Sequence, residues 1–381
     1  MIIQPSDEII FRLLRDVFSP EVQTIAQGLA FVDRMLNTVK PSDNREFLTS
    51  FIDRQLTLEE KSDFKILGQT ILEGFMIAEL QKEGIGEELG KYVVNYVDQL
   101  MLAFSPKLIS QNPYIQHINI DDTEIGSYRL INAKYEAFQP IPYGIPAING
   151  PFVIPRFGFF FKDVTFPVIQ QNNKAWMSIT PIDCLTMMDA IEKARRKVLT
   201  LGCGLGYFAF MAAEKPEVES VTIVDISPEV LKVFSDIILP QFPHKEKIHI
   251  VCDDAILYLK NLQDGIFDYC FADIWKGNSE IDRQLFFGCK EELRRFKQMT
   301  HDCWVEDVFT YDIRATAKTQ MVQELNPIMT AFADKYDKAA RLNNYTHRLY
   351  QKVRINSVKD IEHYTEPKNI LHLIEETSIK Y

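Results

Sequence analysis

The fold of this chain is decided by Lys197-Val-Leu-Thr-Leu-Gly-Cys-Gly-Leu-Gly-Tyr207 and, shortly after it, Val221-Thr-Ile-Val-Asp225. A short apolar strand leads into glycines at alternate positions and then into a helix, and a second, β-branched strand ends in a carboxylate. In a doubly wound sheet the glycines let the main chain approach a nucleoside-containing ligand, and the acid accepts hydrogen bonds from two ribose hydroxyls. This order of elements predicts such a ligand site, and a tight turn without a ligand is the alternative.

The spacing of the glycines indicates which nucleoside is bound. A dinucleotide site usually places its third glycine three positions after the second, where this chain has Tyr207. Gly202-x-Gly204-x-Gly206 is instead typical of enzymes that bind S-adenosylmethionine, which has no pyrophosphate to hold. We therefore expect S-adenosyl-L-methionine as the cofactor.

Composition and charge exclude several classes of protein. The 381 residues are enough for two or three domains, and 46% hydrophobic with 25% charged residues is typical of globular proteins. A net charge of −11 argues against a nucleic-acid partner, although a basic face around Arg294, Arg295 and Lys297 is an alternative to a solvated helix face. Six cysteines without a C-x-x-C pair favour a reducing compartment and no metal site. With no signal peptide and no bilayer-length apolar run, we expect a cytoplasmic protein without membrane contact.

The chain changes character twice, which predicts three parts. Residues 1–110 have helical apolar spacing and a capping box at Thr57-x-x-Glu60, and they predict an all-helical N-terminal domain. Residues 111–178 are rich in proline, aromatic and β-branched residues and predict a small β-rich linking module, with a turn at Asn172-Asn173. Residues 179–381 alternate strand and helix and predict a Rossmann-like domain with C-terminal helices. The predicted fold class is α/β, with a doubly wound, mostly parallel sheet.

The strands and helices of this sheet can be placed by residue number. Strands are expected at 197–201, 221–225, 248–252, 267–272 and 303–309, a long helix at about 281–299, and mostly helices over 312–381. Ser227 and Pro228 predict the start of the helix after the second strand, as N-cap and first helical residue.

Acidic residues follow three successive strands, where ligands of open parallel sheets bind. Asp225 suits the ribose hydroxyls, with capping of the following helix as its alternative role, and Asp254 suits the adenine amino group, with the N-cap of the next helix as its alternative. Asp273 is expected beside the sulfonium, where it could orient an acceptor or take its proton. The predicted cofactor-binding residues are Gly202, Cys203, Gly204, Gly206, Asp225, Ile226, Asp253, Asp254 and Ala255, and the predicted catalytic residue is Asp273.

Four further side chains have a functional and a structural interpretation. Trp275 could cover the cofactor or contact a cation, and Lys276 could bind a carboxylate or be solvated. Glu306 and Asp307 form a second pair of acidic candidates at the end of the expected fifth strand. Trp176 is either a lid over the cofactor or a core residue.

Residues 150–310 resemble the class I S-adenosylmethionine-dependent methyltransferases, within them the branch that includes the spermidine synthases. The resemblance rests on 198–206, 221–225, Asp253-Asp-Ala255 and Phe267-Asp-Tyr-Cys-Phe-Ala-Asp273. It implies a cofactor bound by the glycines with Asp225 and Asp254, and Asp273 at the active centre. The β-rich part ahead of the sheet is similar to the N-terminal strands of aminopropyltransferases.

The chain also departs from that branch. Spermidine synthases carry an aspartate in the glycine loop, where Leu205 stands, and a D-x-x-D pair after the fourth strand, where this chain reads Asp273-Ile-Trp-Lys276. Their glutamate ahead of the first strand is replaced around Trp176, and the sixth and seventh strands of a complete methyltransferase sheet are not found. Three missing polyamine contacts make spermidine an unsuitable substrate, and the D/N-P-P-Y/F signature of base methyltransferases is absent.

These observations leave three functions open. The leading prediction is methyl transfer to N or O of a small-molecule or peptide acceptor. The first alternative is an aminopropyltransferase-like enzyme that uses decarboxylated S-adenosylmethionine and an unusual amine. The second is a non-catalytic nucleoside-binding interaction protein. The helical flanks could also serve a homodimer.

Overall fold

The computed structural model describes residues 162–276, 279–325, 340–377 and 379–381 without a break, most of 101–160, residues 45–63, and short pieces elsewhere between residues 1 and 74. The chain divides into two compact units. One consists of residues 1–15 and 186–381, and the other of residues 16–185.

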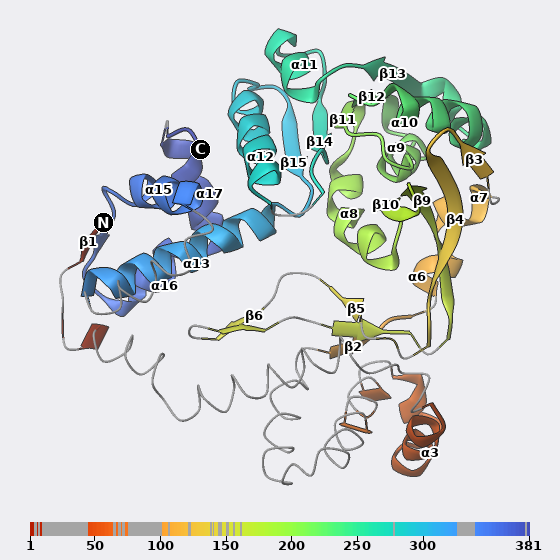
Figure 1. The fold of residues 1–381 in the computed structure, drawn as a ribbon, viewed down its shortest axis with the longest axis horizontal. Helices are drawn as coiled ribbons and strands as arrows, with labels where there is room; N and C mark the ends of the chain where they lie inside the picture. The colour runs from red at the N-terminus through yellow and green to blue at the C-terminus, as the bar shows by residue number, and fades with distance from the viewer. Residues whose placement is uncertain are drawn as a thin grey trace. The chain divides into compact units, whose positions relative to one another are not determined.

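The first unit is built on a five-stranded parallel sheet (Figure 1). Its strands lie in the order β13–β12–β11–β14–β15, with bounds β11 Arg196–Leu201, β12 Val218–Asp225, β13 Ile248–Cys252, β14 Tyr269–Ala272 and β15 Thr300–Cys303. The central strands are apolar because both faces of the sheet are covered: Val198 to Leu201 and Tyr269 to Ala272 are all buried. The predicted doubly wound, Rossmann-like sheet is confirmed.

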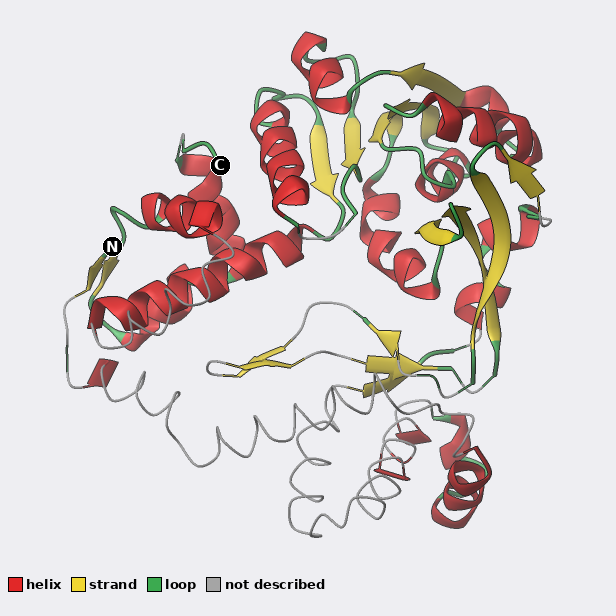
Figure 2. Cartoon of the chain, viewed as in Figure 1, coloured by secondary structure: helices red, strands yellow, loops and turns green. Residues whose placement is uncertain are grey.

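Helices cover both faces of this sheet, as Figure 2 shows. They are α8 Pro181–Lys193 ahead of β11, α9 Tyr207–Ala213, α10 Pro228–Val233 with a π turn and two 3-10 turns after it (234–238, 239–241 and 245–247), α11 Ala255–Asn261 and α12 Glu280–Leu293. Right-handed crossovers put α9 and α10 on one face and α11 and α12, which pack against each other, on the other. Ser227 caps α10 by accepting from the Val230 amide, with Pro228 next to it, as predicted.

The expected fifth strand at 303–309 is wrong. The strand is Thr300–Cys303, and a helix, α13 Glu306–Leu325, begins three residues later. Phe309, Ile313, Ala317 and Met321, four residues apart, are all buried, so Phe309 is the first residue of a buried helix face and not the end of a strand. The helix expected at 281–299 ends earlier, at Leu293.

The described residues of the C-terminal part are mostly helical, as expected. Helices α15 Ala340–Leu349, α16 Val358–Tyr364 and α17 Pro367–Glu376 follow α13. A short parallel pair joins β1 Ile2–Ile3 to β16 Arg354–Ile355. Ile9, 1% exposed, belongs to the same apolar core as α12, α13 and α15. The N-terminal residues therefore fold with the C-terminal helices.

The second unit contains a four-stranded antiparallel sheet in the order β10–β9–β4–β3. Its strands are β3 Thr123–Ile125, β4 Tyr128–Tyr135, β9 Val164–Gln171 and β10 Lys174–Ser178. Asn172 and Asn173 join β9 to β10 with φ of 52° and 61°, a tight hairpin turn at the predicted place. Shorter elements complete the description: α3 Arg45–Gln55, a 3-10 turn at Glu60–Ser62, β2 Met101–Ala103, α6 Lys107–Ser110, α7 Pro113–His117, β5 Ile141–Pro142, β6 Ala147–Asn149, β7 Phe152–Ile154 and β8 Phe157–Phe159.

The three-part division at residues 110 and 178 stays a prediction. Most of the expected helical domain, residues 1–110, lies outside the described residues. Where that part is described, Thr57 and Glu60 form the predicted reciprocal cap: the Thr57 amide donates to Glu60 Oε2 at 2.8 Å, and the Glu60 amide donates to Thr57 Oγ1 at 3.3 Å.

Candidate functional site

The candidate site lies at the carboxyl edge of the parallel sheet, within the first unit. The chain runs outward from β11 to β12 and β13, then returns to β14 and β15 on the other side of β11. The strand order therefore reverses between β11 and β14, and open α/β sheets bind ligands in the crevice at such a point. The glycine turn follows β11 and Asp273 follows β14, so these two predicted elements flank the reversal.

The glycine turn needs glycine for reasons of space as well as of backbone conformation. Gly202, Gly204 and Gly206 have φ of 97°, 55° and 73°. A Cβ on Gly202 would lie 2.1 Å from the main-chain oxygen of Asp273, and one on Gly206 would lie 2.3 Å from the Phe234 ring. Packing thus requires glycine at 202 and 206. At those two positions the alternative of a tight turn without a ligand is therefore supported.

Asp225, at the end of β12, ties the turn to the neighbouring loop. Its Oδ2 accepts from the Cys203 amide and its Oδ1 from the Ser227 amide, both at 2.8 Å. A carboxylate has about four acceptor sites, so these two bonds leave room for donors from a ligand. The side chain is half-buried, and next to it Ile226 is 68% exposed. Burial and the Asp225 charge raise the pKa of the Cys203 thiol well above its usual range, so that thiol stays protonated.

The acids after β13 have local structural partners. Asp254 is the N-cap of α11, with Oδ1 accepting from the Leu257 amide at 2.8 Å, so its alternative role is present in the structure. Asp253 Oδ1 accepts from the Asp254 amide at 2.8 Å, and its own amide donates to the Asp225 main-chain oxygen at 3.1 Å. Ala255 is buried as the first residue of α11. Their roles toward the adenine stay predictions.

Asp273 is held where β14 ends. Its amide donates to the Leu201 main-chain oxygen at 2.8 Å, and its own main-chain oxygen lies against Gly202. Two residues on, Trp275 is 4% exposed, donates from Nε1 to the Trp304 main-chain oxygen at 3.1 Å, and meets Phe286 and Phe309 edge-on. Trp275 therefore packs as a core residue that anchors this loop, which favours its structural interpretation.

The start of α12 secures the other end of the loop. Ser279 and Asp282 form a capping box, and Asp282 Oδ1 also accepts from the Lys276 amide at 2.9 Å. The Lys276 side chain is exposed. It stands where spermidine synthases have their second acid.

The second pair of candidate acids separates in the structure. Glu306 begins α13 and forms a buried ion pair with Lys290 of α12, Oε1 to Nζ at 2.7 Å, whereas Asp307 is exposed. Burial raises the pKa of Glu306 although Lys290 opposes the shift. Burial and the Lys290 charge also lower the pKa of nearby His301 to about 4. This buried Lys–Glu pair has no signal in the sequence, because its members come from two helices that only the fold brings together.

Trp176 lies in β10, in the other unit. Its ring is half-buried, 5.3 Å from the Tyr128 ring on β4. This contact within one sheet favours the core role over a lid.

In the part of the chain that the structure describes, no helix combines the length and apolarity needed to cross a bilayer. No three His, Cys, Asp or Glu side chains in that part are grouped to hold a metal ion.

Residues 184–334 match the family described as the spermine/spermidine synthase domain, which confirms the resemblance drawn from the sequence. No curated protein matches the chain.

Several solved structures align with part of this chain. A spermidine synthase in complex with the transition-state analogue AdoDATO is 12% identical over 37% of this chain and 54% of its own, with a TM-score of 0.29. A Podospora anserina methyltransferase with bound SAH is 17% identical over 33% and 53%, at 0.28. The Thermotoga maritima spermidine synthase is 13% identical over 34% and 48%, at 0.25. The chain thus spans about half the length of each.

Proposed function

We propose that this chain is a transferase of the S-adenosylmethionine-related kind, and specifically a methyltransferase acting on N or O of a small-molecule or peptide acceptor. The observation that carries the proposal is the strand order. It gathers the glycine turn, Asp225 and Asp273 along one carboxyl edge, on both sides of the point where the sheet reverses. The family match over residues 184–334 supports the same class of cofactor.

The residues at this edge suit S-adenosyl-L-methionine. Asp225 keeps acceptor capacity for ribose hydroxyls beside its two main-chain bonds, and charge-assisted bonds of this kind are strong. Ile226, exposed directly after it, offers an apolar surface to the nucleoside. Gly202, Cys203, Gly204 and Gly206 would pass beside the cofactor, with Asp253, Asp254 and Ala255 at the adenine end.

In the proposed reaction the cofactor supplies a methyl group activated by its sulfonium. Asp273 would orient the acceptor or take its proton as the acceptor N or O attacks the methyl carbon in line, while the bond from that carbon to sulfur breaks and S-adenosylhomocysteine leaves. The glycine turn and the loop fixed by Trp275 and Asp282 would hold donor and acceptor together, which removes much of the entropic barrier. The acceptor itself, a homodimer and a cytoplasmic location stay predictions.

Aminopropyl transfer is the second candidate, and the family match is the observation that favours it. Its difficulty is position 276, where an exposed lysine replaces the acid that would attract a polyamine cation. A non-catalytic nucleoside-binding protein is the third candidate. It is supported by the close packing at Gly202 and Gly206, which requires glycine there whether or not the turn serves catalysis.

Calorimetric titration with S-adenosylmethionine, its decarboxylated form and S-adenosylhomocysteine tests the proposal. Preference for the two carboxylated ligands would support a methyltransferase and justify an acceptor screen. Preference for the decarboxylated form would replace it with the aminopropyltransferase. If none of the three binds, the glycine turn is structural and the proposal is wrong.

Two variants assign the roles. Asp225→Ala should weaken nucleoside binding by about 1.5–3 kcal/mol, the range for hydrogen bonds to a charged group. Asp268→Asn is the matched control, because that acid binds the Lys197 amide at the opposite edge of the sheet. Asp273→Asn should keep cofactor affinity and suppress turnover, and full turnover in this variant would place the base elsewhere.

A further inference from the structure

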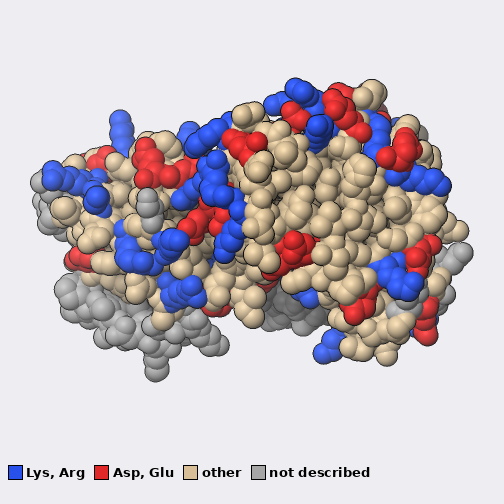
Figure 3. Space-filling model, turned by 90° about the horizontal axis from the view of Figure 1, so that it is seen from above, with Lys and Arg blue, Asp and Glu red and all other residues tan. Residues whose placement is uncertain are grey.

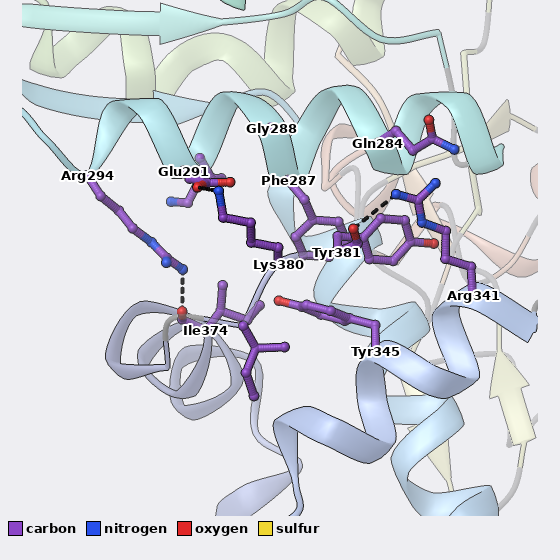
Figure 4. Close-up of a pocket in the computed structure, with 12 residues that line it drawn as sticks. Gln284, Phe287, Gly288, Glu291, Arg294, Arg341, Tyr345, Ile374, Lys380 and Tyr381 are labelled. Atoms are coloured by element: carbon purple, nitrogen blue, oxygen red, sulfur yellow. Dashed lines mark hydrogen bonds and ion pairs between the residues drawn. The ribbon is translucent and has the colours of Figure 1, made fainter. Parts of the chain in front are cut away.

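A cavity lies in the first unit, and the glycine turn does not line it. It has a volume of about 480 Å³, is open to solvent, and is lined by α12, α15, α17 and the last residues of the chain (Figure 4). None of the predicted cofactor-binding or catalytic residues lines it. Cavities of this size hold small molecules.

The lining of this cavity is basic, although the chain as a whole carries a net charge of −11. Its charged residues are four cations, Lys290, Arg294, Arg341 and Lys380, and one acid, Glu291. Figure 3 shows basic side chains gathered, among some acids, over the side of the unit that carries the C-terminal helices. A cavity with this lining favours anions.

Three of the four cations already have partners. Lys290 is paired with Glu306, Lys380 with Glu291 at 2.7 Å, and Arg341 with Glu280 at 3.7 Å, besides donating to the Tyr381 main-chain oxygen at 3.0 Å. The Lys380–Glu291 pair is exposed, at 77% and 44% of its side chains, so it holds Lys380 only weakly.

Arg294 differs from the others because it forms no ion pair with any acid that the structure describes. It reaches from the end of α12 to the Ile374 main-chain oxygen of α17, which accepts from its Nη2 (Figure 4). Its Nε is buried and finds no acceptor among the described residues. A guanidinium carries five N–H donors in a planar array that matches the oxygens of a phosphate or carboxylate, so Arg294 is the natural anchor for an anion here.

The opposite side of the cavity is aromatic. Phe287 stacks on Tyr381 with ring centroids 4.5 Å apart, and Tyr345 contacts both rings, at 4.8 and 5.1 Å. Ile374 adds an aliphatic surface. A flat apolar body could lie along this wall while its charged group faces Arg294.

We propose that this cavity binds a small aromatic oxyanion, with Arg294 and Lys380 taking the charged group and Phe287, Tyr345 and Tyr381 contacting the ring. The site is separate from the proposed cofactor site and does not depend on the proposed function.

Titration of the full chain with 1-naphthyl phosphate tests this proposal. The titration is run with S-adenosylhomocysteine in excess, so that the probe does not report on the nucleoside site. Inorganic phosphate, which has only the charged group, and 1-naphthol, which has only the aromatic ring system and a hydroxyl, are the matched control probes. The proposal expects the naphthyl phosphate to bind more tightly than either half. No binding, or equal binding of inorganic phosphate or 1-naphthol, would overturn it.

Variants locate the bound probe. Arg294→Gln should raise its dissociation constant about tenfold or more, the effect of losing hydrogen bonds to a charged group. Lys297→Gln removes the same charge three residues on, outside the cavity, and should leave binding unchanged. Since Arg294 also bridges α12 and α17, the exposed Lys380→Gln provides a second variant that is expected to fold and to bind more weakly. Unchanged affinity in the folded Arg294 or Lys380 variant would place the probe elsewhere and defeat the proposal.

Discussion

Gly202 leaves no room for a side chain between two strand ends. With φ at 97°, an added Cβ would lie 2.1 Å from the Asp273 main-chain oxygen. Gly202→Ala is therefore expected to lower the free energy of unfolding by about 3 kcal/mol, because backbone strain and overpacking act together. Chemical denaturation followed by circular dichroism measures the loss.

Gly265→Ala is the control for this substitution. Gly265 also has positive φ, 83°, but the nearest atom to its Cβ would be the flexible amide end of Gln298 at 3.1 Å. This change should cost about 1 kcal/mol, the backbone term alone. Equal losses in the two variants would show that contact with Asp273 is not what demands glycine at 202.

His301 gives the fold a pH dependence. Burial and the Lys290 charge lower its pKa from 6.5 to about 4, while Asp302 opposes the shift. Between these values the unfolded chain binds a proton that the folded chain does not, so stability falls as the pH drops. The contribution is complete above pH 6.5 and is lost, by roughly 2–3 kcal/mol, on going down to pH 4.

Comparison with His301→Gln isolates this residue from the carboxylates that titrate in the same range. The variant should gain stability relative to the wild type as the pH falls from 6.5 to 4, in unfolding curves recorded at several pH values. A difference that stays constant across this window would mean that folded His301 takes up its proton normally.

At the scale of elements, α12 and α13 are joined by the buried pair of Lys290 and Glu306, whose side chains are only 6% and 19% exposed. Glu306→Gln would leave the ammonium buried without its counter-charge and should cost about 3 kcal/mol. Lys290→Met combined with Glu306→Leu should recover most of this loss, because no buried charge remains. A double-mutant cycle by chemical denaturation separates the pair from its members.

The exposed pair of Lys232 and Asp236, 2.5 Å apart within one helical segment, is the reference. Asp236→Asn should cost no more than about 0.5 kcal/mol. If Glu306→Gln costs as little, the buried pair does not hold α12 to α13.

The elements that could be predicted from the sequence are those with a local signal. β11, β12 and β13 are predictable because their residues are apolar and β-branched and end in, or are followed by, glycines or acids. The sequence predicts β15 at the wrong place because Thr300-His-Asp-Cys303 is polar, while the following Trp304-Val and Val308-Phe309 have the apolar composition of a strand. Only packing reveals that Phe309 starts a buried helix face. Likewise the position of Asp273 could be predicted, but not the role of Trp275 in fixing its loop.

At the scale of the whole molecule, residues from the start of the chain contribute a strand and a core side chain to the first unit. β1 pairs with β16, and the Ile2 amide donates to the Val353 main-chain oxygen at 3.0 Å. This contact cannot be predicted from the sequence, because two isoleucines are too short a segment to show the alternation of a strand. Their partner strand also lies about 350 residues away in the chain. A fragment cut at the boundary near residue 186 would lose both the strand pair and Ile9.

Substitution of Ile9 tests how much the N-terminal residues stabilise the first unit. Ile9 is 1% exposed and belongs to the core formed with α12, α13 and α15, so Ile9→Ala should lower the free energy of unfolding by about 3 kcal/mol, as truncation of a buried isoleucine does. Ile2→Ala, at a side chain that is 52% exposed, should cost less than about 1 kcal/mol. Both are measured by chemical denaturation with the fluorescence of Trp275 and Trp304, which lie in the first unit, as the signal. A negligible loss in Ile9→Ala would mean that the sheet and C-terminal helices hold together without the N-terminal residues, so a fragment starting near residue 186 should then fold on its own.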